Sequence, residues 1–434
     1  MRNTGIALLI ILAVLAGVYG VYRQRAHSRL VAAVDEIKAT GAPVTLDELN
    51  AWYEDVPAAE NAANVYGEAF EAFDDIEKRL PSVPIVGGAD LPDRTEPVSD
   101  EMKAATAQYL ERQGQALELL HRAARLRKCR FPLDLTQGPQ VQLPHLSQLR
   151  HAARLLSLEA VFRAENQEGE GAAQSLVAAL AVGRSLQNEP LIISQLVRFA
   201  CDKIVSDALE QVLNRTPLAD DQLADLGQAV AEAGLPGGLT RAFIGERSSF
   251  LASITKQRET ATPRRGALRK AYFEWSGFED IDRAAYLGYM SRLIETDGLS
   301  PPESLDTIAA LADEASNLSP WRRPLTRVLM PALARAKEAE PRHAAHIYLA
   351  QAALAIERYR LTNGDPPARL AELVPSYLGQ APKDPFDGEE LRYLKKSSEY
   401  VVYSIGPNRR DDRGKQGEDA RFSGDVTLTV ALRP

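Results

Sequence analysis

The chain has 434 residues, enough for two or three domains, and its 45% hydrophobic and 25% charged residues are typical of a globular protein. A net charge of −8 argues against the basic surface by which proteins bind nucleic acid, so we expect no nucleic-acid partner. The two cysteines, Cys129 and Cys201, exclude a disulfide-rich class. Two buried thiols are the favoured interpretation, and a single disulfide stays open.

An uncharged apolar stretch lies near the N-terminus. Residues 5–22 read GIALLIILAVLAGVYGVY, and as a helix they span about 27 Å, close to the ~30 Å hydrocarbon core of a bilayer. Tyr19 and Tyr22 stand at one end, where aromatic rings favour the membrane interface. A cleaved signal peptide is the alternative, although its apolar region is usually shorter, about 7–15 residues. We predict a single-pass transmembrane anchor within residues 1–25.

The charges beside this stretch bear on its orientation. Arg2 precedes it, whereas Arg23, Arg25 and Arg29 follow, which slightly favours a cytoplasmic position for the body of the protein. A short N-terminal tail before a first apolar segment is, however, typical of an export signal. We therefore predict a bacterial inner-membrane protein with most of its chain outside the cytoplasm.

Residues 26–340 have helical periodicity with almost no strand signal. Thr45 begins a capping box with Glu48, and Ser99 is placed to cap a long helix. Between 145 and 214 the short links between apolar-faced segments predict helical hairpins. A Pro/Gly-rich loop is expected at about 81–100 and a subdivision near 235–240. Because no fixed repeat period is found, we predict an irregular solenoid-like or bundle domain.

Residues 341–434 have a different pattern. An apolar stripe at helical spacing runs from 345 to 361 and ends at Asn363-Gly364. Short alternating segments at 391–395, 400–405 and 426–432 predict half-buried strands. The fold class expected for the whole chain is therefore mostly α, with a small C-terminal α+β domain whose helix packs on an antiparallel sheet.

Several short motifs follow one another along this C-terminal region. They are Tyr359-x3-Asn363-Gly364-x2-Pro367, Asp384-Pro385-Phe386-x-Gly388, Tyr393, Tyr403-Ser404-Ile405-Gly406 and Gly424-Asp425-Val426. As an ordered set they resemble the C-terminal domain of the major pseudopilin of type II secretion systems. The resemblance covers residues 345–430 and suggests no family for 26–340. It implies a long helix on a small sheet, and a loop that binds calcium.

The resemblance also implies the calcium ligands. The Ile405 carbonyl would be a backbone ligand, Asn408 stands where the family has an aspartate, and Asp425 matches the acid that closes the loop. Asp411 and Asp412 lie between them and would supply further oxygens, which suit calcium; Asp419 is a third such acid. The alternative is a metal-free loop, because basic residues at 409, 410, 413, 415 and 421 would neutralise the acids.

The chain also departs from that family. It has neither the basic leader with a peptidase site nor the acid within the apolar span that pseudopilins have. About 320 residues also separate the span from the C-terminal region, whereas the family has one continuous helix there. We therefore do not expect a processed filament subunit.

The sequence holds no G-x-S-x-G, H-E-x-x-H or strand-linked G-x-G-x-x-G motif. We therefore predict a non-enzymatic, membrane-anchored protein that binds protein partners in the envelope or in a secretion-related assembly. The alternative is a hydrolase-like envelope enzyme with its site in 240–330. There Glu274, Glu279, Asp280 and Asp282 accompany an aromatic cluster, and paired carboxylates in an apolar pocket can act as acid and base.

Overall fold

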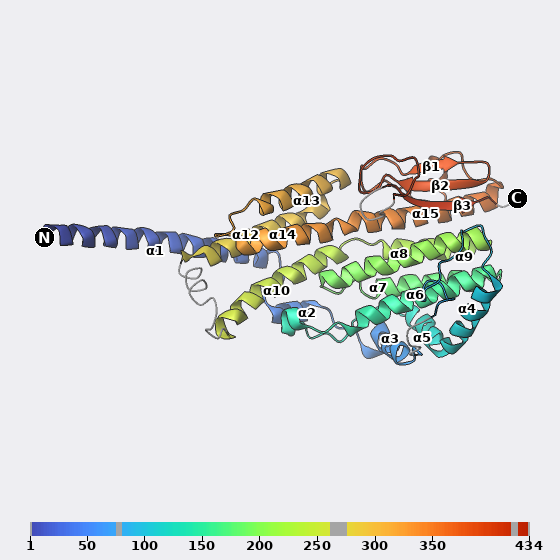
Figure 1. Cartoon of the computed structure of the whole chain (residues 1–434), viewed down its shortest axis with the longest axis horizontal. Helices are drawn as coiled ribbons and strands as arrows, with labels where there is room; N and C mark the ends of the chain where they lie inside the picture. Colours follow the sequence, from blue (N-terminus) through green and yellow to red (C-terminus); the bar gives the residue numbers. More distant parts are fainter. Residues whose placement is uncertain (1, 75–79, 261–275, 418–423, 433–434) are drawn as a thin grey trace.

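The computed structural model describes residues 2–74, 80–260, 276–417 and 424–432; the side chains of 2–5, 7–9 and 252–260 are not described. Within these residues the fold is helical apart from one small antiparallel sheet, which confirms the predicted mostly-α class. Figure 1 shows the first helix projecting from one end of an elongated body, with the sheet at the other end.

Helix α1 (Arg2–Ala39) holds the predicted membrane span. Its later residues pack on the body, where Ala26 and Ile37 are buried, while its first half projects away (Figure 1). Over the described part of the chain, no helix is long and apolar enough to cross a membrane. Residue 5 and residues 7–9 of the predicted span lie outside the described side chains. The predicted anchor is therefore not confirmed.

A first group of helices forms most of the body. Thr45 and Glu48 form the predicted capping box, and the Ser99 side chain accepts the Met102 N–H as expected. The predicted hairpins in 145–214 are present as consecutive packed helices. The group comprises α2 (Leu46–Trp52), η1 (Ala58–Glu60), α3 (Ala62–Glu71), α4 (Asp100–Arg112), α5 (Gly114–Ala124), η2 (Leu135–Gln140), α6 (Pro144–Glu165), α7 (Gly169–Arg184), α8 (Ile192–Arg215) and α9 (Asp220–Ala233).

A second group of helices lies beside the end of α1. Phe243, Tyr286 and Met290 form its buried core together with Ile37 of α1. The group comprises α10 (Gly238–Thr260), α12 (Phe278–Glu295), η3 (Thr296–Gly298), α13 (Pro301–Ser316) and α14 (Pro324–Lys337). α1 is therefore held to the body through α12.

The C-terminal region begins with the long helix α15 (Ala339–Asn363), which Gly364 ends in the left-handed conformation. After the short helix η4 (Leu370–Leu373), strands β1 (Arg392–Lys395), β2 (Glu399–Ser404) and β3 (Val426–Ala431) pair antiparallel in that order. The three predicted strands are confirmed to within one residue at each end. One face of α15 packs on β2 and β3, and the other packs on α8 and α9.

The free edge of β3 is covered by α8. The Asn214 amide donates to the Thr429 carbonyl and accepts the Ala431 N–H, both at 2.8 Å. The Glu210 carboxylate accepts the Thr429 N–H at 3.1 Å. These contacts satisfy backbone groups that an edge strand would otherwise leave open. The sheet and the first group of helices share one buried core, so the sheet is part of the body.

Candidate functional site

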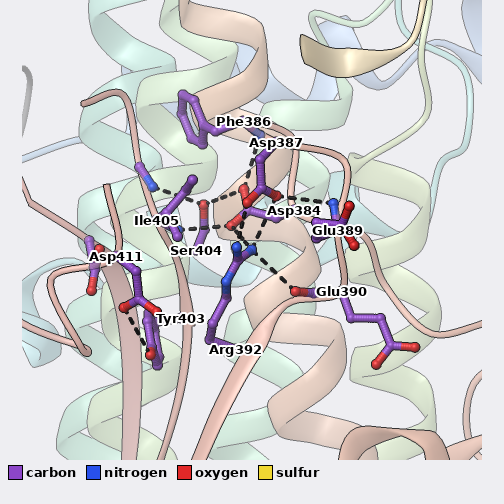
Figure 2. A network of polar contacts seen from close by, with 12 residues as sticks. Asp384, Phe386, Asp387, Glu389, Glu390, Arg392, Tyr403, Ser404, Ile405 and Asp411 are labelled. Carbon is purple, nitrogen blue, oxygen red and sulfur yellow. Dashed lines mark hydrogen bonds and ion pairs between the residues drawn. The ribbon is translucent and has the colours of Figure 1, made fainter. Parts of the chain in front are cut away.

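The turn that precedes β1 is tied to the end of β2 by one buried carboxylate. Asp384 is 0% exposed and accepts the Phe386 N–H at 3.0 Å and the Ile405 N–H at 2.8 Å. The Ser404 hydroxyl and the Arg392 guanidinium also donate to it, at 2.8 and 3.1 Å. Figure 2 shows these donors converging on Asp384. Burial raises the pKa of this carboxyl, and the hydrogen bonds oppose the rise. Asp384 therefore fixes the base of the predicted calcium loop.

The described part of that loop is closed by Asp425. Its two carboxylate oxygens accept the Asp412 N–H at 3.2 Å and the Gly414 N–H at 2.7 Å. The Asn408 amide donates to the Asp412 carboxylate at 2.9 Å. Burial raises the pKa of Asp425. Each oxygen of Asp425 thus accepts one backbone N–H group.

Asp411 and Ile405, two further residues of the predicted ligand set, also make hydrogen bonds. Asp411 accepts the Tyr403 hydroxyl at 3.2 Å, as Figure 2 also shows, and the Arg413 N–H at 2.8 Å. Ile405 is buried and its N–H donates to Asp384, while the ligand predicted at this residue is its carbonyl. Asp419 lies outside the described residues. Among the residues that the structure describes, no three acidic, histidine or cysteine side chains gather as a metal site. The predicted calcium site, part of which lies outside the described residues, stays a prediction.

The acids of the described part of the loop accept hydrogen bonds rather than pairing with the arginines beside them. Arg409 reaches out of the loop to Asp306 on α13 at 2.5 Å. The bonds that Asp411, Asp412 and Asp425 accept come from backbone N–H groups, a hydroxyl and an amide. Among the described residues, the basic side chains at 409, 410, 413 and 415 contribute none of these bonds.

The acids of the alternative enzyme site have structural roles where they are described. Asp282 is 0% exposed and accepts the Leu325 and Thr326 N–H groups at 2.8 and 3.1 Å, which caps α14. Glu279 pairs with Arg283, and Asp280 lies 3.5 Å from His27. Glu274 lies outside the described residues. The three described acids therefore serve a cap and ion pairs.

The sequence interpretation missed three histidine–carboxylate pairs. His145 contacts Glu189 at 3.1 Å, and His343 contacts Asp202 at 2.8 Å, with both carboxylates 0% exposed. His121 contacts Glu159 at 2.8 Å. No short sequence motif predicts these pairs, because the partners are 38 to 141 residues apart in the chain.

Two of these pairs include a serine, but not in a catalytic arrangement. Ser194 donates to Glu189, and Ser175 donates to Glu159 at 2.8 Å. In a serine hydrolase the histidine stands between the serine and the acid and removes the serine proton. Here the acid stands in the middle, so the histidine does not activate the serine.

A cavity of about 640 Å³ lies between β3, α8 and α15, and Asp425 reaches its wall. Burial lowers the pKa of His346 in this wall to about 3, so this histidine is neutral at physiological pH. Burial raises the pKa of Glu210 to about 7, against the lowering effect of the Thr429 N–H and Arg94. The cavity thus joins the predicted loop to the helical body through groups of shifted pKa.

A larger groove, about 710 Å³, crosses α5, α7 and α9. Four small apolar side chains that line it are buried or half-buried and define its floor: Ala173, Val177, Ala178 and Ala229. Basic residues stand where α7 ends and where the chain leaves α5, namely Arg125, Arg127 and Arg184. Acidic residues stand near the starts of α7 and α9, namely Glu170, Asp221 and Asp225. The groove therefore has an apolar floor and ends of opposite charge.

The basic end of the groove also contains one acid, Glu232. It accepts both the Arg184 guanidinium at 2.7 Å and the Arg127 guanidinium at 2.9 Å. One carboxylate thus faces two arginines, with Arg125 beside them in the groove wall. This end stays net positive.

Comparison with protein-family models, with curated proteins and with solved structures returns no match to the chain. The resemblance to pseudopilins therefore stays a prediction from the motifs in 345–430.

Proposed function

We propose that this chain is a membrane-tethered binding protein, without catalytic activity, whose α5–α7–α9 groove receives a segment of a protein partner. The groove itself carries the proposal. Its apolar floor and charged ends are the arrangement by which proteins hold a partner segment and fix its direction.

The groove limits what that segment can be. α7 has 16 residues and is therefore about 24 Å long. A segment lying along it would place acidic side chains at Arg125 and Arg127 and basic side chains at Asp221 and Asp225. The small side chains of the floor leave room for larger apolar side chains of the partner. Because the charges are at the surface, binding would weaken as salt increases.

The tether is proposed to be the first half of α1. Ile10, Leu15 and Val18 are 59%, 58% and 62% exposed, on a helix that projects from the body (Figure 1). A helix that is apolar around its whole circumference is stable in an apolar phase and not in water. We propose a bilayer as that phase, with residues 5–22 crossing the bacterial inner membrane once. The body would lie outside the cytoplasm, and the resemblance in 345–430 suggests a secretion-related assembly.

The groove is tested with the full-length protein, purified with its partners from detergent-solubilised membranes. The test variant reverses two groove acids, Glu170→Lys and Asp225→Lys. The control variant, Asp100→Lys with Glu111→Lys, makes the same charge change on α4, again with one acid in a first helical turn. Equal melting midpoints would show that both variants fold.

We expect the wild-type protein and the control to retain the same partner and the groove variant to lose it. Retention of that partner by all three proteins, or a wild-type protein that retains none, would contradict the proposal. Protease treatment of spheroplasts tests the side of the membrane, since a body outside the cytoplasm is cleaved without lysis.

A further inference from the structure

The turn between α13 and α14 exposes a tryptophan. Trp321 is 78% exposed, the highest value for a large apolar side chain among the described residues. Arg322 and Arg323 follow it directly, and Arg327 lies one turn into α14. An aromatic ring beside arginines is typical of segments that lie at a membrane interface, where the ring is half in the apolar phase and the guanidinium groups meet phosphate.

Contacts place this turn at the level where α1 leaves the body. The Arg322 guanidinium lies 5.4 Å from the centre of the Phe278 ring, at the start of α12. At the preceding residue, Gly277, an added Cβ would lie 3.0 Å from Arg23 Cδ and 3.6 Å from Tyr22 Cε1. A short chain of contacts thus leads from the turn to Tyr22. Figure 1 shows α12 and α14 beginning at the end of the body from which α1 projects.

Tyr22 is the last residue of the apolar stretch 5–22. If that stretch lies in the hydrocarbon core, the residues level with Tyr22 stand in the headgroup layer. That layer is several ångströms deep on each side of the core. Trp321 and its arginines are therefore at the depth where such side chains are favoured.

Charge at this end of the body suits an anionic surface. Arg23, Arg25 and Arg29 lie on α1 beside the same level. The nearby acids of α12 face inward: Asp282 caps α14, and Glu279 pairs with Arg283. Glu314, near the end of α13, pairs with Arg292.

We propose that Trp321, with Arg322, Arg323 and Arg327, inserts into the headgroup layer of an anionic bilayer as a second attachment point. The inference rests on the proposed tether through α1. Two separated attachments would fix the tilt of the body on the membrane, and with it the direction in which the α5–α7–α9 groove faces. The alternative to a bilayer on this face is a protein partner, since Val328 further along α14 is also 71% exposed.

The test uses full-length protein with Trp52→Phe and Trp275→Phe, which leaves Trp321 as the only tryptophan. It is reconstituted into vesicles of phosphatidylglycerol and phosphatidylcholine, with and without lipids brominated on the acyl chain near the headgroup. We expect strong quenching of Trp321 emission by the brominated lipid. Quenching is expected to fall when phosphatidylglycerol is omitted. The control retains Trp52, which packs on Arg241, and is expected to be unquenched.

Flotation of the vesicles separates the two hypotheses. Protein that floats while Trp321 stays unquenched overturns the second attachment and leaves the tether intact. Protein that does not float overturns both. A Trp321 that is unquenched in vesicles but shielded from aqueous iodide in native membranes also overturns the proposal, and assigns this face to a protein partner.

Discussion

Replacing Asp384 by alanine removes the carboxylate that joins the turn before β1 to the end of β2. The change leaves the buried Phe386 and Ile405 N–H groups and the Ser404 hydroxyl without their acceptor. Each orphaned buried donor costs about 1–3 kcal/mol, and removing one partner of a buried charge pair typically costs about 3–5 kcal/mol. Arg392 keeps Asp387 as a partner, which limits the loss. We expect Asp384→Ala to destabilise the protein by about 3–5 kcal/mol.

The assay is urea unfolding of the full-length protein followed by circular dichroism, comparing the midpoint of the transition that involves the sheet. Asp387→Ala is the matched control. This carboxylate is 24% exposed, pairs with the same arginine and accepts only the Glu389 N–H from the backbone. Its removal should cost about 1 kcal/mol. If Asp384→Ala lowered the free energy of unfolding no more than Asp387→Ala does, Asp384 would not be the main link between the turn and β2.

Three further predictions concern other positions. The pKa of Glu210 is about 7 in the folded protein and 4.5 in the unfolded chain, so the free energy of unfolding should fall by about 3 kcal/mol as pH rises between these values. Glu210→Gln keeps a hydrogen-bond acceptor and should remove this pH dependence from the melting midpoint. Asp425→Asn should lower the melting midpoint equally with calcium and with chelator; a calcium-induced rise that this variant abolishes would instead support the metal site. Gly183→Ala should destabilise α7, because the added Cβ would lie 2.2 Å from a carboxylate oxygen on α8. Gly227→Ala has open space around it and should stabilise α9 by about 0.5–1 kcal/mol in the same urea assay. Equal effects of the two variants would contradict the packing described.

Local signals in the sequence predicted local structure well. The capping box at Thr45, the helix end at Gly364 and the three strands depend on residues a few positions apart, and all are present. The long helix near the C-terminus was only partly foreseen. The predicted stripe is buried at Leu349, Ala352 and Ile356 and half-buried at Tyr348 and Tyr359. Leu354 on another face is buried too, because α8 and α9 pack on that side.

Features that depend on distant residues could not be predicted. His343 and Asp202 are 141 residues apart, and the groove needs three helices to pack side by side. The acidic loop shows a further reason. The resemblance implied a ligand set, but the sequence does not reveal that the Asp425 carboxylate accepts two backbone N–H groups.

Binding of a protein partner in the α5–α7–α9 groove is tested most directly by photo-crosslinking in living cells from Gln174, an exposed residue in the wall of this groove. A photoreactive phenylalanine analogue replaces Gln174 in one strain and Gln108, exposed on α4, in the control strain. We expect a single adduct of defined mass from position 174 that is lost with Glu170→Lys and Asp225→Lys, and none from position 108. No adduct from position 174, or the same adducts from both positions, would contradict it.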